Sequence, residues 1–322
     1  MPLKLDDIDL SMTTASPLAI GIDLGGTHIK AALLERDTGS LMQTRTVPTC
    51  DGEWSGSEPL FAHRVRDLVH GLEASAGCGL LSVGLCAPGL AHSGGRYIDW
   101  MPGRMHGLEK FDWSAFLARE VRVMNDAHAA LLGEVWVGSG RGCQDVIMLT
   151  LGTAVGGAIL SGGKLIRGHI GRGGHLGHTS IDADGAQDAF QMPGSLDSFL
   201  GNRTLLQRTE GRYASTEALV AAAIAGELEA QVVWDASVRR LAVALASLIN
   251  VLDPELVIFG GGISAGAGDA LLAPLQSYLD QYEWRPGGHR VPLTQASAGE
   301  WAGAIGCARE LGRTPIEGSS KY

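Results

Sequence analysis

An acid, two glycines and a threonine interrupt an apolar run near the start of the chain. Residues 20–30 read I-G-I-D-L-G-G-T-H-I-K, a pattern that predicts a strand, a tight turn and a second strand. Gly25 and Gly26 could take positive φ or let another group approach the backbone, and Thr27 adds a hydroxyl, so this turn could hold phosphate. Asp23 points toward the same place and suits Mg²⁺. An ordinary glycine hairpin with a buried acid fits the same residues.

A second turn of the same kind follows about 130 positions later. Residues 145–160 read D-V-I-M-L-T-L-G-T-A-V-G-G-A-I-L, which predicts two apolar strands around Gly152 and Thr153. Two such turns indicate two halves of the chain that each offer a phosphate-binding turn to one cleft. The similarity is one of pattern and not a detected repeat.

A third candidate lies between these turns, where residues 121–137 read V-R-V-M-N-D-A-H-A-A-L-L-G-E-V-W-V. The pattern predicts a short strand that ends at Asn125 and Asp126, with a helix beginning at once. Asp126 has two interpretations: an N-cap that satisfies free helix N–H groups, or a general base that accepts a proton from a substrate hydroxyl. Asn125 would share the pocket, because its amide both donates and accepts hydrogen bonds.

The elements that must position these residues follow from hydrophobic periodicity. Strands are predicted at residues 18–22, 29–34 and 41–47 as an antiparallel meander, then a helix over 60–72 and a buried strand at 81–86. Later come a helix at 215–224, a long helix over 232–249, a buried strand at 257–259, a surface helix over 271–279 and a last strand at 291–296. The fold class is α/β. A doubly wound dehydrogenase fold would place a helix after its glycine turn, whereas a strand follows here.

The loop over residues 87–113 is rich in glycine and aromatic residues, among them Trp100 and Trp113. It could line a pocket, or its aromatic side chains could pack at the edge of a domain.

Composition excludes several classes of function. The 322 residues are 45% apolar and 19% charged, which is typical of a soluble globular protein with room for two domains. A net charge of −10 without a basic run argues against nucleic acid as a partner. No apolar stretch could span a membrane, and residues 1–17 lack the core of a secretory signal. The five cysteines are scattered, so we expect reduced thiols without metal and a cytoplasmic location.

Several motifs, in order along residues 18–312, resemble the ROK family of sugar kinases and repressors in the actin-like ATPase superfamily. The motif D-x-G-G-T-x-x-K stands at Asp23, Gly25, Gly26, Thr27 and Lys30. The motif N-D-x-x-A-x-x-G-E stands at Asn125, Asp126, Ala129, Gly133 and Glu134, and T-L-G-T-x-x-G-G begins at Thr150. A glycine turn on the nucleotide side matches Gly260, Gly261 and Gly262, and G-E-x-x-G-A-x-G runs from Gly299 to Gly306.

The resemblance implies a two-domain actin-like ATPase fold, of the ribonuclease-H-like kind, with a cleft between the domains. The smaller domain would comprise residues 18–124 and 302–322, the larger one residues 125–301, and residues 1–17 would form a flexible leader. The implied activity is ATP-dependent transfer of the γ-phosphoryl group to a hexose, on the 6-hydroxyl of glucose or a related sugar. A homodimer is expected on the same ground.

The resemblance also assigns roles to residues. Asp126 would be the catalytic base, and Asp23 would hold Mg²⁺ directly or through water. ATP would contact Asp23, Gly25, Gly26, Thr27, Lys30, Gly152, Thr153, Gly260, Gly261 and Gly262. The sugar would contact Gly89, Asn125, Asp126, His175, His178 and Asp197.

The chain also departs from the family pattern. The zinc motif C-x-C-G-x-x-G-C should follow His178, but residues 182–199 contain no cysteine, so zinc is not expected. His175 stands where the family has a glutamate, Asp197 replaces another glutamate, and Gly103 replaces an asparagine. These changes leave the preferred sugar open.

Three histidines within ten residues, His169, His175 and His178, have other interpretations. They could be hydrogen-bonded to the backbone, or they could bind a metal, although glycine-rich spacing fixes no ligand geometry. For the chain as a whole, a non-catalytic sugar sensor or pseudokinase, or a kinase with another donor such as polyphosphate, also remains open. Repressors of the family carry a DNA-binding module ahead of the kinase-like part, which about 17 residues before Leu18 are too few to supply.

Overall fold

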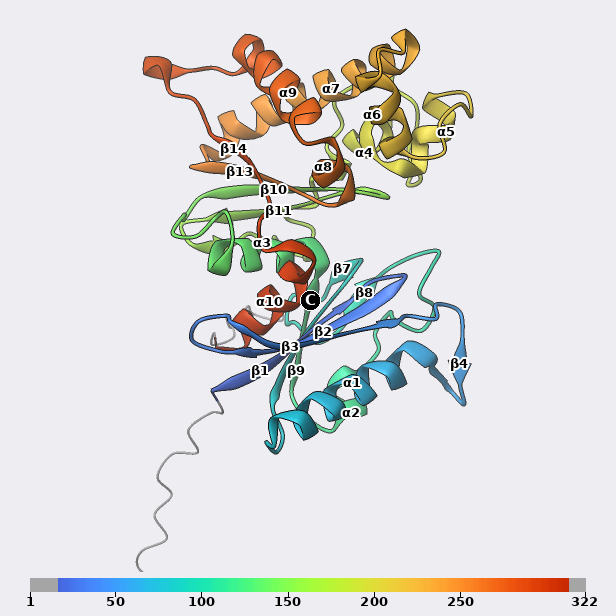
Figure 1. The fold of residues 1–322 in the computed structure, drawn as a ribbon, viewed down its shortest axis with the longest axis vertical. Coiled ribbons are helices and arrows are strands. Elements are labelled where there is room, and N and C mark those ends of the chain that lie inside the picture. The colour runs from blue at the N-terminus through green and yellow to red at the C-terminus, as the bar shows by residue number, and fades with distance from the viewer. Residues whose placement is uncertain (1–16, 313–322) are drawn as a thin grey trace, which may run out of the picture.

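Two five-stranded sheets organise residues 17–312, the part of the chain that the computed structural model describes (Figure 1). The first sheet has the strand order β3-β2-β1-β6-β9, with β1 Leu18–Leu24, β2 His28–Glu35, β3 Leu41–Pro48, β6 Ser82–Ala87 and β9 Val121–Asn125. The second has the order β12-β11-β10-β13-β14, with β12 Lys164–Leu165, β11 Val155–Ser161, β10 Val146–Leu151, β13 Leu256–Gly260 and β14 Leu293–Gln295. Short hairpins add β4 Trp54–Ser55 with β5 Glu58–Pro59 and β7 Leu90–Ala91 with β8 Ile98–Trp100.

The first sheet confirms the predicted meander, because β1, β2 and β3 pair in antiparallel order. Strands β1, β6 and β9 run parallel, so their carboxyl ends meet at one edge of the sheet. Asp23 near the end of β1 lies opposite Lys30 on β2 and beside Cys86 on β6, and Asn125 ends β9. The edge therefore gathers most of the polar residues that the sequence analysis selected from this half.

The helices α1, Leu60–Ala76, and α2, Trp113–Leu117, cover one face of the first sheet (Figure 1). Trp113 is fully buried against Phe61 of α1, so this part of the aromatic loop packs in the core. Trp100 is half exposed. The packing interpretation of the loop over residues 87–113 is thus confirmed for Trp113, and the pocket-lining interpretation stays a prediction.

The second sheet combines the antiparallel hairpin β10–β11 with parallel pairing of β10, β13 and β14. One face is covered by α6 Thr216–Ile224, α7 Leu228–Leu252 and α9 Asp269–Tyr282. Shorter helices are α4 Leu196–Leu200, α5 Leu205–Arg208, α8 Gly262–Ala267 and the 3₁₀ turn η1 Leu176–His178. The predicted helices 215–224, 232–249 and 271–279 are confirmed, each within a few residues. The last strand is three residues long and not the predicted six.

Two helices lie between the sheets in Figure 1, α3 Asp126–Val137 and α10 Ala302–Arg309. Their backbones touch: a Cβ added to Gly306 would lie 1.7 Å from the carbonyl oxygen of Ala129, and one on Gly133 would lie 2.3 Å from that of Ala302. No residue other than glycine fits at either position without moving a helix.

Glu134, on α3 beside Gly133, is fully buried. Its carboxylate accepts hydrogen bonds from the backbone N–H groups of Ser139, Ser297 and Ala298 at 2.9, 3.1 and 2.8 Å. It thereby ties α3 to the segment that leads into α10. The G-E pair of the family motif therefore has a structural role here.

Some predictions fall outside the described residues. The leader over residues 1–16 and the C-terminal stretch 313–322 are not described, so the predicted leader and the predicted end of the smaller domain are untested. Within residues 17–312, no helix is long and apolar enough to cross a membrane.

Candidate active site

Two carboxylates, those of Asp23 and Asp126, lie near enough to influence each other where the first sheet meets α3. Asp23 is partly buried, and the Sγ of Cys86 donates to its Oδ1 at 3.6 Å. Burial and the negative charge of Asp126 raise the pKa of Asp23 to about 6, although Lys30 and Cys86 oppose the shift. Two neighbouring carboxylates that are partly shielded from solvent favour the binding of a cation or a proton.

The N-cap position of α3 is occupied by Asn125 and not by Asp126, which lies in the first turn of the helix. The Oδ1 of Asn125 accepts hydrogen bonds from the N–H groups of Ala127 and His128 at 3.0 and 3.2 Å. Its Nδ2 donates to the carbonyl oxygen of Gly89 and to Oδ1 of Asp126, both at 3.0 Å. The amide of Asn125 therefore has a full set of protein partners and holds Asp126 in place.

Gly89 supplies the other end of this arrangement. Its φ is +105°, and an added Cβ would lie 2.6 Å from the carbonyl oxygen of Trp100. Only glycine can take that conformation so close to another strand. Gly89, which the sequence analysis assigns to the sugar site, thus supports Asn125 through its carbonyl oxygen.

Asp126 begins α3, and its Oδ1 accepts the N–H of Ala127 at 2.8 Å. Burial raises the pKa of Asp126, while the N–H of Ala127 and the guanidinium of Arg104 oppose the shift. A raised pKa brings a carboxylate closer to the value at which it accepts protons efficiently near neutral pH.

Arg104 is a candidate that sequence reasoning missed. Its Nη1 lies 3.2 Å from where a Cβ of Gly26 would stand, so the guanidinium rests against the first glycine turn. Neither Gly25 nor Gly26 has a positive φ. An added Cβ at Gly25 would lie 3.0 Å from the carbonyl oxygen of His28, whereas one at Gly26 would meet only the movable end of the Arg104 side chain. Arg104 follows Pro102 and Gly103 in an irregular loop, and nothing in the local sequence indicates where it points.

The first turn is closed by backbone contacts. The N–H of Gly25 donates to the carbonyl oxygen of His28 at 3.1 Å, and its own carbonyl accepts the hydroxyl of Thr49 at 2.6 Å. Thr27 is exposed at the tip. Lys30 is engaged elsewhere, because its Nζ contacts Oε2 and the carbonyl oxygen of Glu300 at 3.0 and 3.3 Å.

The second glycine turn and the C-terminal glycines are neighbours, because Thr150 on β10 pairs with Gly260 on β13. The carbonyl oxygens of Gly152 and Thr153 accept hydrogen bonds from the N–H groups of Asn202 and Arg203, each at 3.0 Å. Thr153 is exposed. Gly261 has a φ of +87°, and an added Cβ would lie 2.3 Å from the carbonyl oxygen of Leu151. Gly261 and Gly262 are both exposed.

His175 carries a buried Nε2 without a hydrogen-bond partner within the described chain. Burial and the charge of His178 lower the pKa of His175, and only Asp126 opposes the shift, so the imidazole is neutral at pH 7. Next to it, His128 packs at 5.7 Å between ring centroids, and its Nε2 meets the carbonyl oxygen of Gly173 at 2.8 Å. Burial and His175 lower the pKa of His128 to about 4. His128 is a structural histidine that the sequence analysis did not single out.

Asp197 is buried in the first turn of α4, and its Oδ1 accepts the N–H of Val155 at 2.6 Å. Burial raises its pKa, and the N–H of Val155 and the charge of Arg203 oppose the shift. This carboxylate therefore ties α4 to β11 behind the second glycine turn, with one oxygen already engaged.

His178 ends η1, and its Nδ1 lies 3.8 Å from Oδ2 of Asp188. Sequence reasoning missed Asp188, which lies in the cysteine-free segment where the family carries its zinc motif. Within residues 17–312, no group of three His, Cys, Asp or Glu side chains has a metal-binding arrangement. The donors of this segment do not fit zinc.

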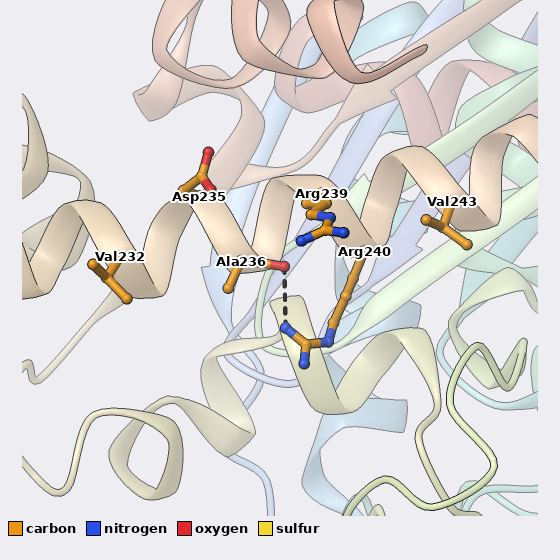
Figure 2. Close-up of a pocket in the computed structure, with 6 residues that line it drawn as sticks. All are labelled: Val232, Asp235, Ala236, Arg239, Arg240 and Val243. Atoms are coloured by element: carbon orange, nitrogen blue, oxygen red, sulfur yellow. Dashed lines mark hydrogen bonds between the residues drawn. The ribbon is translucent and has the colours of Figure 1, made fainter. Parts of the chain in front are cut away.

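A surface pocket on α7 lies away from these residues. It is lined by Val232, Asp235, Ala236, Arg239, Arg240 and Val243, and Nη1 of Arg240 donates to the carbonyl oxygen of Ala236 (Figure 2). Helix α7 covers the face of the second sheet opposite to α3. The pocket is therefore no part of the site around Asp126.

Comparison with known proteins agrees with this geometry. The ROK family model matches residues 19–311. A glucokinase of Halalkalibacterium halodurans is 30% identical over 330 aligned residues, which cover 89% of this chain and 92% of the relative.

Solved structures agree as well. The ROK hexokinase of Thermus thermophilus superposes with a TM-score of 0.79 at 28% identity, over 91% of this chain and 97% of that one. A ROK family glucokinase of Streptomyces griseus, in complex with glucose and AMPPNP, gives a TM-score of 0.71 at 28% identity, over 90% and 98%. Motifs, fold and similarity over nearly the whole described chain lead to one conclusion: the protein belongs to the ROK family and has the actin-like ATPase fold of its sugar kinases.

Proposed function

We propose that this protein transfers the γ-phosphoryl group of ATP to the 6-hydroxyl of glucose or a related hexose. The observation that carries the proposal is the placement of Asp126, a carboxylate with a raised pKa at the head of α3, oriented by Asn125 and near His175 and Arg104. Similarity to glucokinases, one of them in complex with glucose and AMPPNP, supports the same reaction.

In this proposal Asp126 accepts the proton of the attacking sugar hydroxyl. General-base assistance of this kind is worth about 10²- to 10⁴-fold in rate. The remaining acceleration comes from alignment of the hydroxyl with the phosphate and from neutralisation of charge around a loose transition state. Arg104, which rests against the first glycine turn, is a second cation available to the transferred group.

The two glycine turns would bind the phosphates, at Gly25, Gly26 and Thr27 on one side and at Gly152 and Thr153 on the other. Gly260, Gly261 and Gly262 would border the nucleoside. Because Lys30 pairs with Glu300, it would help to hold β2 in place beside the phosphates and would not contact them directly.

Asp23 would hold Mg²⁺, directly or through water. The fit rests on burial and charge: partial burial and the neighbouring Asp126 carboxylate raise the pKa of Asp23 to about 6, and a divalent cation would offset the negative charge of the pair. Bound Mg²⁺ supplies neutralisation of the phosphate oxygens.

The sugar would lie against His175 and His178, with Gly89, Asn125 and Asp197 supporting the pocket from behind. A neutral His175 offers one donor or one acceptor where the family has a glutamate that only accepts. Because of this exchange, the preferred hexose can be glucose or a related sugar.

The remaining parts of the proposal rest on the family resemblance. The halves would act as domains with limits near residues 124/125 and 301/302, at the starts of α3 and α10, and would close on the sugar to exclude water. A homodimer and a cytoplasmic location belong to the same proposal.

A coupled ADP-release assay with Mg-ATP against a panel of hexoses and amino sugars tests this function. We expect turnover on one sugar that is lost in Asp126→Ala. The matched control is Asp184→Asn, which changes an exposed acid on the segment after η1. No turnover, with sugar binding still visible by calorimetry, would favour a sensor, and turnover with polyphosphate alone would assign another donor.

A further inference from the structure

Asp188 anchors the cysteine-free segment between η1 and α4. Its Oδ1 accepts the N–H groups of Phe190 and Met192 at 2.8 and 3.0 Å, and its own N–H donates to the carbonyl oxygen of Met192 at 2.9 Å. The residue is 8% exposed. Burial would raise the pKa of Asp188, but hydrogen bonds from the N–H of Met192, the hydroxyl of Ser195 and the N–H of Phe190 lower it. A buried carboxylate that stays ionised therefore closes this turn.

The other oxygen of the same carboxylate faces His178. Oδ2 of Asp188 and Nδ1 of His178 are both buried and both lack a hydrogen-bond partner within the described residues. The two atoms are 3.8 Å apart, longer than a hydrogen bond but within ion-pair reach. Buried polar atoms without partners are costly, and each of these two could satisfy the other. Contacts of this kind are often loose before a substrate binds and shorten in its complex.

The surroundings fix the ring of His178 from a second direction. The ring of Phe190 meets it edge-on, at 5.1 Å between centroids and 77° between planes. Because Phe190 also donates its N–H to Asp188, one turn holds the carboxylate and the aromatic ring together. The His178 side chain remains 38% exposed while Nδ1 is buried, so its exposed part lies on the other side of the imidazole.

We propose that Asp188 is a positioning residue that selects the tautomer of His178 with the proton on Nδ1, so that Nε2 accepts a hydrogen bond from a sugar hydroxyl. This inference rests on the proposed function, because it assigns the direction of a contact in the sugar site. A carboxylate accepts hydrogen bonds only, so it selects the tautomer with the proton on the nitrogen that faces it. The sugar hydroxyl must then be the donor toward His178, which restricts how the hydroxyls of the bound sugar can be arranged.

The test variant is Asp188→Asn, which keeps the shape of the side chain. Its Oδ1 can still accept the N–H groups of Phe190 and Met192, whereas its NH₂ group now donates toward His178 and moves the proton to Nε2. We expect the KM for the hexose to rise about tenfold or more, with the KM for ATP and the melting temperature nearly unchanged. Asp184→Asn is the control on the same segment. An unchanged KM for the hexose in Asp188→Asn would overturn the proposal.

The tautomer itself gives a readout that a purely structural role would not move. Imidazole ¹⁵N shifts of ¹⁵N-histidine-labelled protein, recorded at about pH 8.5 where imidazoles are neutral, distinguish the two tautomers. The signals of His178 are identified by their loss in His178→Gln. We expect protonated Nδ1 in the wild type and protonated Nε2 in Asp188→Asn.

Wild-type protein with the proton of His178 on Nε2 would overturn the proposal, even if the variant failed to fold. The result is separable from the proposed function. A wild type that neither binds nor phosphorylates any hexose would overturn the kinase assignment, while the tautomer of His178 would still decide the role of Asp188.

Discussion

The proposed base side and the proposed sugar side of the site are built differently. Around Asp126, the amide of Asn125 uses both of its lone pairs and both of its protons on protein partners. On the sugar side, three buried atoms lack partners: Nε2 of His175, Nδ1 of His178 and Oδ2 of Asp188. Within residues 17–312, half of the buried side-chain atoms without a hydrogen-bond partner therefore lie in this one short segment. The rest of the described chain has few of them.

The difference indicates where catalysis and selectivity reside. A network with every bond made holds its catalytic group in place before substrate arrives, which favours rate. Nε2 of His175 is left for a ligand of matching donors and acceptors, and the His178–Asp188 pair would orient a second contact to that ligand, which favours discrimination among ligands. Changes on the two sides should therefore affect different kinetic constants.

The largest expected effect is that of Asp126→Asn on the base side. The amide keeps the shape but accepts no proton, so kcat should fall at least about 100-fold. Sugar affinity by calorimetry should stay close to that of the wild type. Turnover near the wild-type level would show that Asp126 is not the general base, and the comparison of a catalytic side with a selective side would then fail.

The next effect concerns the pH dependence of stability through Asp23. Its folded pKa of about 6 lies above the ordinary value of 3.8, so its contribution to stability is present below pH 3.8 and is lost as pH rises through 6. Asp23→Asn should remove this loss and stabilise the ligand-free protein above pH 7 by about 1 to 3 kcal/mol. Urea unfolding at pH 5 and pH 8 measures it. Equal pH dependence in variant and wild type would contradict the assignment.

Asn125→Ala should cost about 1 kcal/mol of stability, because α3 loses its cap, and should also lower kcat, because Asp126 loses its orienting partner. Ser215→Ala, which removes the cap of α6, is the matched control. It should show a similar loss in urea unfolding with kcat unchanged. If Asn125→Ala also leaves kcat unchanged, the amide acts on the helix alone.

The smallest expected effect, on the sugar side, is that of His175→Glu. The variant restores the family's acceptor, so the ranking of hexoses by kcat/KM should shift by about three- to tenfold between sugars. The rate on the best sugar should change less than in Asp126→Asn. An unchanged ranking would mean that His175 does not face the sugar.

Much of the fold could be predicted from the sequence because its signals are local. Apolar runs broken by glycine place β1, β2, β10 and β11, and the junction at Asn125 and Asp126 marks the end of β9 and the start of α3. Which of those two residues caps the helix depends on side-chain geometry that neighbouring letters do not determine.

The parts that escaped prediction depend on contacts across the chain. Arg104 reaches Gly26 from a loop without periodicity, and Asp188 meets His178 across a turn whose letters indicate only irregular structure. His128 looks like any helical residue until His175 packs on it. Such residues could be found in sequence only by correlated change in relatives.

The contact of Gly133 and Gly306 has a consequence for how this active site keeps its dimensions. The helices α3 and α10 lie between the two sheets and touch through backbone atoms. The distance between these helices, and with it the spacing of the sheets, is therefore set by main-chain contact and not by the size of a side chain. A single methyl group at either glycine would push apart the two walls that carry the glycine turns. The width of the proposed phosphate site would thus depend on two glycines that need not touch a ligand and that have no side chain.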